Sequence, residues 1–202
     1  MTVRVLFFDV GGVLGTNGWD RTQRGRAVER FGLDADEFAD RHECVVADLE
    51  TGKMSFEEYL DWTVFHRERP FTRDEFRAFV WGRSQPYPEV LDLVDRIGGR
   101  LLLATLNNES RELNEYRIER FGLRRWFPLF FSSCYVGMRK PEPEIYRLAV
   151  DVVNLDPSEC LFVDDRAINV ERASAEGIDA VRFDGDVAAL ERELTLRGVE
   201  VR

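Results

Sequence analysis

The sequence has no long apolar run. Within its 202 residues the longest apolar stretches have the length of a strand, such as Val5–Phe8 and Leu101–Ala104. A membrane-spanning helix needs about 18 consecutive apolar residues. An apolar run also begins close behind Met1, which leaves no space for the basic region and apolar stretch of a signal peptide. We therefore expect no membrane contact and a cytoplasmic location.

Cysteine is scarce, and no cluster of positive charge occurs. Cys44, Cys134 and Cys160 are an odd number at unrelated spacings, which indicates neither a disulfide framework nor a zinc site. Lysine and arginine total 28 against 38 aspartates and glutamates, a net charge of −10, and the arginines are scattered. This balance argues against a nucleic-acid partner and against an anionic membrane surface. An oligomeric state cannot be predicted from these features.

Two patterns alternate along the rest of the chain. Short, nearly continuous apolar runs are typical of strands that are buried on both faces. These runs are Val3–Phe8, Arg100–Thr105, Leu129–Ser133, Cys160–Val163 and Asp179–Phe183. Helical patterns, several of them followed by glycine, cover Pro88–Ile97, Glu109–Phe121, Glu142–Val153, Asn169–Glu176 and Val187–Leu196. The alternation predicts an α/β fold, with a parallel sheet and helices on both of its faces.

Residues 16–85 interrupt the alternation with a pattern of about four helices. Ser55–Glu58 and Thr72–Glu75 both fit the capping box, in which a hydroxyl and a carboxylate bind the free amides at a helix start. Several aromatic residues are expected to form the core of this insert: Trp62, Phe65, Phe76, Phe79 and Trp81. We therefore predict a core domain of residues 1–15 and 86–202 with a helical insert of residues 16–85.

Polar groups follow three of the predicted strands. Asp9 ends the first strand and is followed by Gly11 and Gly12, whose backbone a ligand can approach closely. Asp164 and Asp165 end another strand, and adjacent carboxylates repel each other unless a cation is present. In a parallel sheet these strand ends meet in the ligand crevice. Because Mg²⁺ prefers carboxylate oxygens, together with waters and a substrate phosphate, a magnesium site is the better account of the three aspartates.

Each of these features also has a simpler interpretation. An aspartate at a strand end often only makes a turn or caps the next helix. A nucleotide-binding loop is a weak alternative, because Gly12, Gly15 and Gly18 match neither the dinucleotide fingerprint nor a P-loop.

Two further segments supply groups that suit a phosphate. Thr105, Leu106 and Asn107 place a hydroxyl and amides at the end of the second strand. Lys140 lies just before a helix. Three aspartates, one Mg²⁺ and one lysine bring the site to about neutral charge, and a phosphate dianion can enter such a site.

Four segments together resemble the haloacid dehalogenase (HAD) superfamily, in its phosphatase-like branch with a helical cap inserted after the first strand. They are FFDVGGVL, LLLATLNN, GMRKPEPEIY and LFVDDRAINV, in this order within residues 5–170. The resemblance implies a Rossmann-like core and identifies residues 16–85 as the cap. It also implies a Mg²⁺-dependent phosphatase that acts on a small phosphorylated metabolite, with sugar phosphates among the candidates.

The same resemblance assigns roles to individual residues. Asp9 is implied as the nucleophile that forms a phosphoaspartate, with Thr105 and Lys140 as the other catalytic groups. The implied metal ligands are Asp9, the backbone carbonyl of Gly11, Asp164 and Asp165. The implied substrate-binding residues are Gly12, Thr105, Leu106, Asn107 and Lys140.

Gly11 departs from the family pattern. Most similar phosphatases have a second aspartate there, which acts as general acid and base, and losing such a group typically costs about 10²–10⁴-fold in rate. The substrate could have a good leaving group, or water or a residue of the cap could replace the acid. Asp20, His42, Asp48 and Glu50 are the candidate replacements. The alternatives to a phosphatase are a non-catalytic phosphate-binding protein and, less favoured, a 2-haloacid dehalogenase.

Overall fold

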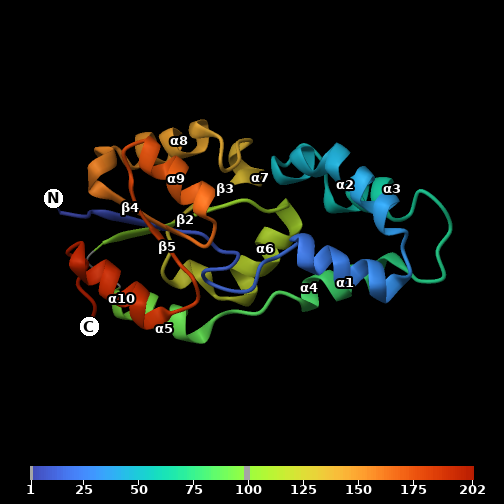
Figure 1. The fold of residues 1–202 in the computed structure, drawn as a ribbon, viewed down its shortest axis with the longest axis horizontal. Helices are drawn as coiled ribbons and strands as arrows, with labels where there is room; N and C mark the ends of the chain where they lie inside the picture. The colour runs from blue at the N-terminus through green and yellow to red at the C-terminus, as the bar shows by residue number, and fades with distance from the viewer. Residues whose placement is uncertain (1, 98–100) are drawn as a thin grey trace.

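The computed structural model describes residues 2–97 and 101–202 (Figure 1). Its centre is one parallel sheet of five strands in the order β3-β2-β1-β4-β5. The strands are β1 Val5–Phe8, β2 Leu102–Asn107, β3 Leu129–Ser132, β4 Cys160–Asp164 and β5 Asp179–Arg182. They confirm the five predicted strands to within one or two residues at each described end. Arg100, the start of the second predicted strand, lies outside the described residues, as does the Gly98-Gly99 pair that follows the helical pattern Pro88–Ile97.

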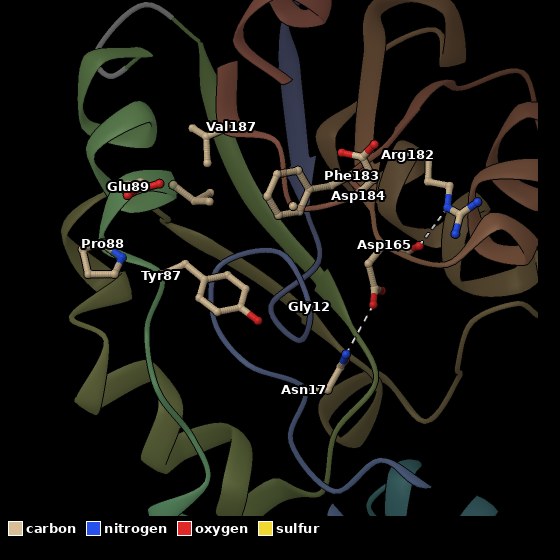
Figure 2. A pocket seen from close by; sticks show the side chains of 12 residues that line it. Gly12, Asn17, Tyr87, Pro88, Glu89, Asp165, Arg182, Phe183, Asp184 and Val187 are labelled. Atoms are coloured by element: carbon tan, nitrogen blue, oxygen red, sulfur yellow. Dashed lines mark hydrogen bonds between the residues drawn. The ribbon is translucent and has the colours of Figure 1, made fainter. Parts of the chain in front are cut away.

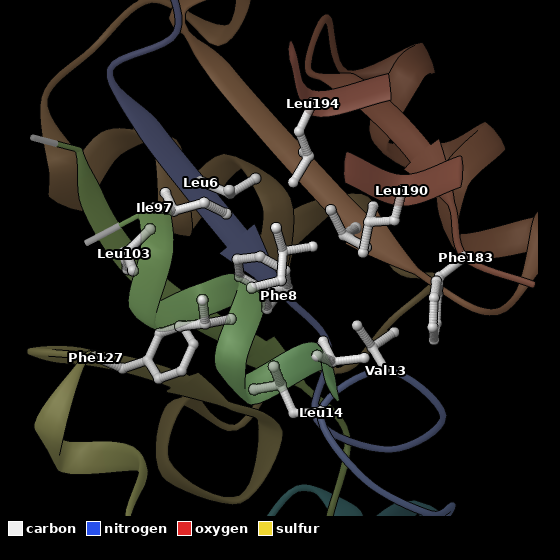
Figure 3. Close-up of a cluster of buried hydrophobic side chains, with 14 of the residues drawn as sticks. Leu6, Phe8, Val13, Leu14, Ile97, Leu103, Phe127, Phe183, Leu190 and Leu194 are labelled. Atoms are coloured by element: carbon white, nitrogen blue, oxygen red, sulfur yellow. The ribbon is translucent and has the colours of Figure 1, made fainter. Parts of the chain in front are cut away.

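Helices cover both faces of this sheet, as predicted. One face carries α5 (Pro88–Ile97), α6 (Arg111–Arg120) and α10 (Val187–Leu196), and the other carries α8 (Pro143–Val153) and α9 (Ala167–Ala175). Because side chains alternate along a strand, Leu6 and Phe8 of β1 enter the first core, while Val5 and Phe7 enter the second. Figure 3 shows the first core, where Leu190 and Leu194 of α10 face β1. The fold is therefore a Rossmann-like α/β fold.

Three short elements connect these helices and strands. They are the 3₁₀ turns η1 (Leu123–Arg125) and η2 (Pro157–Glu159) and the one-turn helix α7 (Ser133–Val136). The sequence pattern extends the third strand to Ser133, and that assignment is wrong by one residue, because α7 begins there.

Residues 16–85 contain the four helices of the insert, α1 (Arg21–Phe31), α2 (Ala35–Glu50), α3 (Phe56–Thr63) and α4 (Arg73–Gly82). Both predicted capping boxes are present, at Ser55 before α3 and at Thr72 before α4. Four of the five aromatics predicted for the core of the insert pack in or against its apolar cluster. Trp62 is the exception. It is 49% exposed and lies beside the guanidinium of Arg41.

The segments that lead into and out of the insert are hydrogen-bonded neighbours. The Thr16 amide donates to the Gln85 carbonyl at 2.8 Å, and the Thr16 hydroxyl donates to the Arg83 carbonyl at 2.7 Å. A second contact comes from α6, whose Leu113 is fully buried in the apolar cluster of the insert. The Glu112 carboxylate on α6 also accepts a hydrogen bond from the Phe56 amide at the start of α3. The insert is thus attached at its two linkers and along one face of α6, and Glu50 of α2 also pairs with Arg139 at 3.0 Å.

All three cysteines are free thiols. Within the described residues, no helix combines the length and the apolar character needed to cross a membrane.

Candidate active site

The sheet brings the predicted aspartates together at its carboxyl end. The chain runs outward from β1 to β2 and β3 on one side, and from β4 to β5 on the other, so β1 and β4 flank the point where the strand order reverses. This is where ligands bind in open α/β sheets. Asp9 directly follows β1, and Asp164 and Asp165 lie at the end of β4. One carboxylate oxygen from each of the three lies within 4.8 Å of the others.

Lys140 lies among these carboxylates. Its ammonium nitrogen is 3.0 Å from Asp9 Oδ1 and 2.5 Å from Asp164 Oδ2, and the side chain is 1% exposed. The backbone of Lys140 is fixed by Asn108, whose side-chain amide donates to the Lys140 carbonyl and accepts from the Lys140 amide, both at 2.8 Å. Asn108 is the last residue of the segment LLLATLNN, but its pairing with Lys140 was not predicted, because an amide that binds a distant backbone leaves no pattern in the sequence.

Asp164 and Asp165 differ in how many hydrogen bonds their carboxylates accept from the protein. Asp164 accepts hydrogen bonds from the Arg166 amide and the Asn169 side chain, besides Lys140. Asp165 accepts one long hydrogen bond from Asn17, and its Oδ1 is buried without a partner. Such an orphaned oxygen beside two other carboxylates is what a bound cation would satisfy. The donor set therefore fits a divalent metal ion.

Burial and mutual repulsion disfavour negative charge in this cluster. Burial raises the pKa of Asp9 to about 7; Lys140 lowers it, and Asp164 and Asp165 raise it further. Burial likewise raises the pKa of Asp165. Burial lowers the pKa of Lys140, but Asp164 and Asp9 outweigh this, so that the pKa of the lysine lies above its usual value. The protein alone supplies one cation for three carboxylates, and a metal ion would balance the remaining charge.

The loop after β1 wraps closely around Asp165. Gly12 has a φ of +77°, a region that favours glycine, and a Cβ atom on it would collide with the Asp165 carboxylate. Its amide donates to the Gly15 carbonyl at 2.8 Å, which closes the loop. Any side chain at position 12 would therefore displace one of the candidate metal ligands.

The predicted phosphate-binding segment ends β2. Thr105 is fully buried next to Phe8 of β1, and its hydroxyl has no hydrogen-bond partner among the described residues. The Asn107 side chain is used internally, because it donates to Asn114 and accepts from Ser132. The Leu106 side chain belongs to the second core. Of the three, Thr105 has the side chain that is available to a ligand.

The four candidate replacements for the missing acid have other surroundings. Asp20 caps α1 by accepting from the Gln23 amide, Glu50 pairs with Arg139 at 3.0 Å, and Asp48 is exposed on α2. His42 is buried and lies 2.9 Å from the Tyr59 hydroxyl. Burial, and then Arg24, lower the pKa of His42 to about 4, so this imidazole is neutral at pH 7.

A cavity of about 730 Å³ opens beside Asp165 (Figure 2). Gly12 and Asn17 border it on the side of the aspartates, and the rings of Tyr87 and Phe183 line it further out. The cavity adjoins the candidate metal site and is large enough to hold a small molecule.

Comparison with curated proteins gives partial matches to several hydrolases. A flavin mononucleotide hydrolase from Arabidopsis thaliana is 37% identical over 71 residues, which cover 35% of this chain and 29% of that protein. A fructose-1-phosphate phosphatase from Escherichia coli is 26% identical over 105 residues, which cover 52% of this chain and 55% of that protein. A bifunctional epoxide hydrolase from Sus scrofa is 26% identical over 96% of this chain, but the match covers 39% of that protein.

Solved structures match over nearly the whole chain. A HAD family enzyme from Bacteroides thetaiotaomicron, in its magnesium complex, has a TM-score of 0.82 at 22% identity and covers 95% of this chain and 100% of its own. An L-2-haloacid dehalogenase from Xanthobacter autotrophicus has a TM-score of 0.64 at 20% identity, with 98% and 85% covered. At these identities the matches show the shared fold. Residues 3–177 match the profile of the haloacid dehalogenase-like hydrolases, and the chain therefore belongs to this family of hydrolases.

Proposed function

We propose that this hydrolase is a Mg²⁺-dependent phosphatase that acts on a small phosphorylated metabolite through a phosphoaspartate at Asp9. The observation that carries the proposal is the cluster in which Asp9, Asp164 and Asp165 surround one point beside Lys140. Support also comes from relatives named as a fructose-1-phosphate phosphatase and a flavin mononucleotide hydrolase, and from the magnesium complex of the Bacteroides enzyme.

In this proposal Asp9, Asp164, Asp165 and the backbone carbonyl of Gly11 would hold the metal ion. When bound, Mg²⁺ neutralises charge on the carboxylates and on the phosphate oxygens. Thr105 donates its unpartnered hydroxyl to a phosphate oxygen, and Lys140 supplies the second positive charge. Gly12, Leu106 and Asn107 line the phosphate, the latter two through their backbone.

The protein contributes position and electrostatics to the reaction. The Asp9 carboxylate is oriented by the Val10 amide and Lys140, both of which contact Oδ1. A carboxylate oxygen attacks phosphorus, and the bond from phosphorus to the leaving oxygen breaks with its electron pair. Water then attacks the phosphoaspartate, which frees inorganic phosphate and restores Asp9. Lys140 and Thr105 stabilise the charge that develops on the phosphoryl oxygens.

We further propose that residues 16–85 act as a cap over a core of residues 1–15 and 86–202. The two linkers and α6 attach this insert on the side of the sheet where the strands end. Closure of such an insert excludes water from the reacting groups and sets substrate preference.

A panel of phosphorylated metabolites, assayed for phosphate release with Mg²⁺ and with EDTA, tests the proposal. The panel includes sugar 1-phosphates, nucleoside monophosphates and flavin mononucleotide. We expect turnover that requires Mg²⁺ and falls to background in Asp9→Asn. The matched control is Asp151→Asn, which alters an exposed aspartate on α8.

Three outcomes would count against the proposal. Turnover that survives Asp9→Asn excludes the proposed nucleophile. Binding of a phosphate mimic without any turnover indicates the non-catalytic alternative. Halide release from 2-haloacids without Mg²⁺ indicates a dehalogenase.

A further inference from the structure

A buried ion pair lies beside the loop that lacks the usual acid. Arg117 on α6 and Glu109 just before α6 are 2% and 7% exposed, and Arg117 Nη1 donates to Glu109 Oε2 at 3.1 Å. Neither residue belongs to the metal and phosphate groups described above. A pair of charges this deeply buried is expensive unless its geometry is well satisfied.

The pair fills space that two glycines leave open. A Cβ atom on Gly11 would lie 3.6 Å from Arg117 Nη1 and 3.1 Å from Asn17 Oδ1. A Cβ atom on Gly18 would lie 2.9 Å from the same Nη1 and would collide with the Glu109 carboxylate. The guanidinium and the Asn17 side chain therefore both lie on the side of Gly11 from which the side chain of an acid would extend.

The guanidinium is held in place by other groups and keeps free donors. Its Nη2 donates to the Thr16 carbonyl, and its Nε is buried without a partner. Glu109 is itself fixed, because its Oε1 accepts from the Ser110 amide at 3.0 Å and its own amide donates to the Ser133 hydroxyl at 3.0 Å. Arginine has five N–H donors and stays charged at any working pH. It can stabilise an anion but cannot protonate one.

The role of the Arg117 guanidinium depends on which side of the phosphate the leaving group departs from. In an in-line displacement the leaving oxygen departs on the side of phosphorus opposite the attacking carboxylate. A general acid at position 11 would have to reach the leaving oxygen, so that oxygen departs on the side to which a side chain at Gly11 would extend. This side of Gly11 faces the linker of residues 16–18 through Asn17, and Arg117 lies there as well.

We propose, on the basis of the phosphatase function above, that Arg117 stabilises the leaving oxygen as an anion in place of a general acid at position 11. Glu109 is a positioning residue that fixes the guanidinium. Because no proton is delivered, the enzyme selects phosphates whose leaving group is stable as an anion. Acyl phosphates and phosphates on an anomeric oxygen meet this condition better than phosphates of ordinary alcohols.

The test is a series of aryl phosphates whose phenols span a range of pKa values. For each variant, the logarithm of kcat/KM is plotted against the pKa of the leaving phenol. Removing an electrostatic donor of this kind typically costs about 10²–10³-fold. For Arg117→Met we expect a loss of this size on the most basic leaving group, a smaller loss on the most acidic one, and therefore a steeper slope. Arg117→Lys restores part of the slope.

Control variants separate this role from a structural one. Arg120→Met alters an exposed arginine on the same helix and leaves rates and slope unchanged. The double variant Arg117→Met/Glu109→Gln leaves no unpaired charge, and it reproduces the steeper slope if its thermal unfolding stays cooperative. Gly11→Asp supplies a group that can donate a proton, and it makes the slope shallower than in the parent protein.

The possible failures can be told apart. Equal losses across the series, or parallel slopes in parent and Arg117→Met, show that Arg117 only supports the loop, and they overturn this inference while the phosphatase function stands. If the parent hydrolyses no aryl phosphate and no phosphorylated metabolite, or if hydrolysis survives Asp9→Asn, the phosphatase proposal fails and this inference fails with it.

Discussion

Lowering the pH should destabilise the insert through His42. Its Nδ1 lies 2.9 Å from the Tyr59 hydroxyl, and that hydroxyl oxygen also accepts a hydrogen bond from the Trp19 indole at 2.8 Å. The Tyr59 proton is therefore free to bind Nδ1 of the neutral imidazole. Protonating the imidazole would remove this acceptor and place a positive charge in a buried site, next to the charge of Arg24.

The size of the effect follows from the pKa of His42 in the two states. Burial and Arg24 lower this pKa from 6.5 in the unfolded chain to about 4 in the fold. Between these values the unfolded chain binds a proton that the folded protein does not, so the free energy of unfolding decreases as the pH falls. From pH 7.5 to pH 5.0 this single group removes at most about 2 kcal/mol, and the loss levels off once the pH falls below the pKa of about 4 in the fold.

Urea unfolding at a series of pH values measures this change. Asp9 and Glu109, whose pKa values burial raises to about 7 and about 6, respond in the opposite sense within the same range. The comparison is therefore made with His42→Asn, whose amide oxygen can accept from Tyr59 but carries no titrating charge. The native protein should lose about 2 kcal/mol more than this variant between pH 7.5 and 5.0. Parallel curves, or a relative gain for the native protein at low pH, would refute the reasoning.

Three further substitutions test other parts of the structure. In Gly12→Ala the new methyl group collides with the Asp165 carboxylate, and residue 12 has a φ of +77° that disfavours alanine. The affinity for Mg²⁺, measured by calorimetric titration, should therefore fall at least tenfold. An unchanged affinity would contradict the role of Asp165 as a metal ligand. Thr105→Val removes a buried hydroxyl that has no hydrogen-bond partner among the described residues. The melting temperature should be unchanged or higher, because no hydrogen bond within the protein is lost. Inhibition by inorganic phosphate should weaken, because the proposed donor to phosphate is gone. Gly25 lies on the exposed face of α1, and a Cβ added there meets no described atom outside the backbone of its own helix within 4 Å. Gly25→Ala should therefore raise the free energy of unfolding in urea by about 0.5–1 kcal/mol. A lower free energy of unfolding would show that this face is packed against another element.

Local patterns predict much of this fold because local physics determines those parts. Cys160–Val163 of β4 are apolar on both faces and are buried on both faces. The hydroxyl and carboxylate of Ser55 and Glu58 mark the start of α3 without reference to any distant residue. Strand ends in a parallel sheet meet at one edge, and this alone places Asp9 near Asp164.

The remaining features depend on contacts between distant parts of the chain. Asn108 fixes Lys140 across 32 positions, and the Arg117 guanidinium reaches the Thr16 carbonyl across 101 positions. Trp62 shows the converse case, since its apolar character predicts burial but its place on α3 turns it outward. Spacing along the chain does not show which surfaces meet in the fold. It therefore reveals neither the hydrogen bonds between Asn108 and the Lys140 backbone nor the buried ion pair of Arg117 and Glu109.

The way the insert is attached limits how it could be exchanged in evolution or by design. At the paired linkers, the two cut ends at Thr16 and Gln85 already lie side by side, so a different insert of almost any size could be spliced there without strain in the core. The face of α6 sets the stricter condition, because Leu113 would lie bare once the present helices were removed. A successful graft would have to bring its own apolar surface for Leu113 and its own partner for Glu112. In relatives with a different insert, we therefore expect substitutions on this face of α6 rather than at the two linkers.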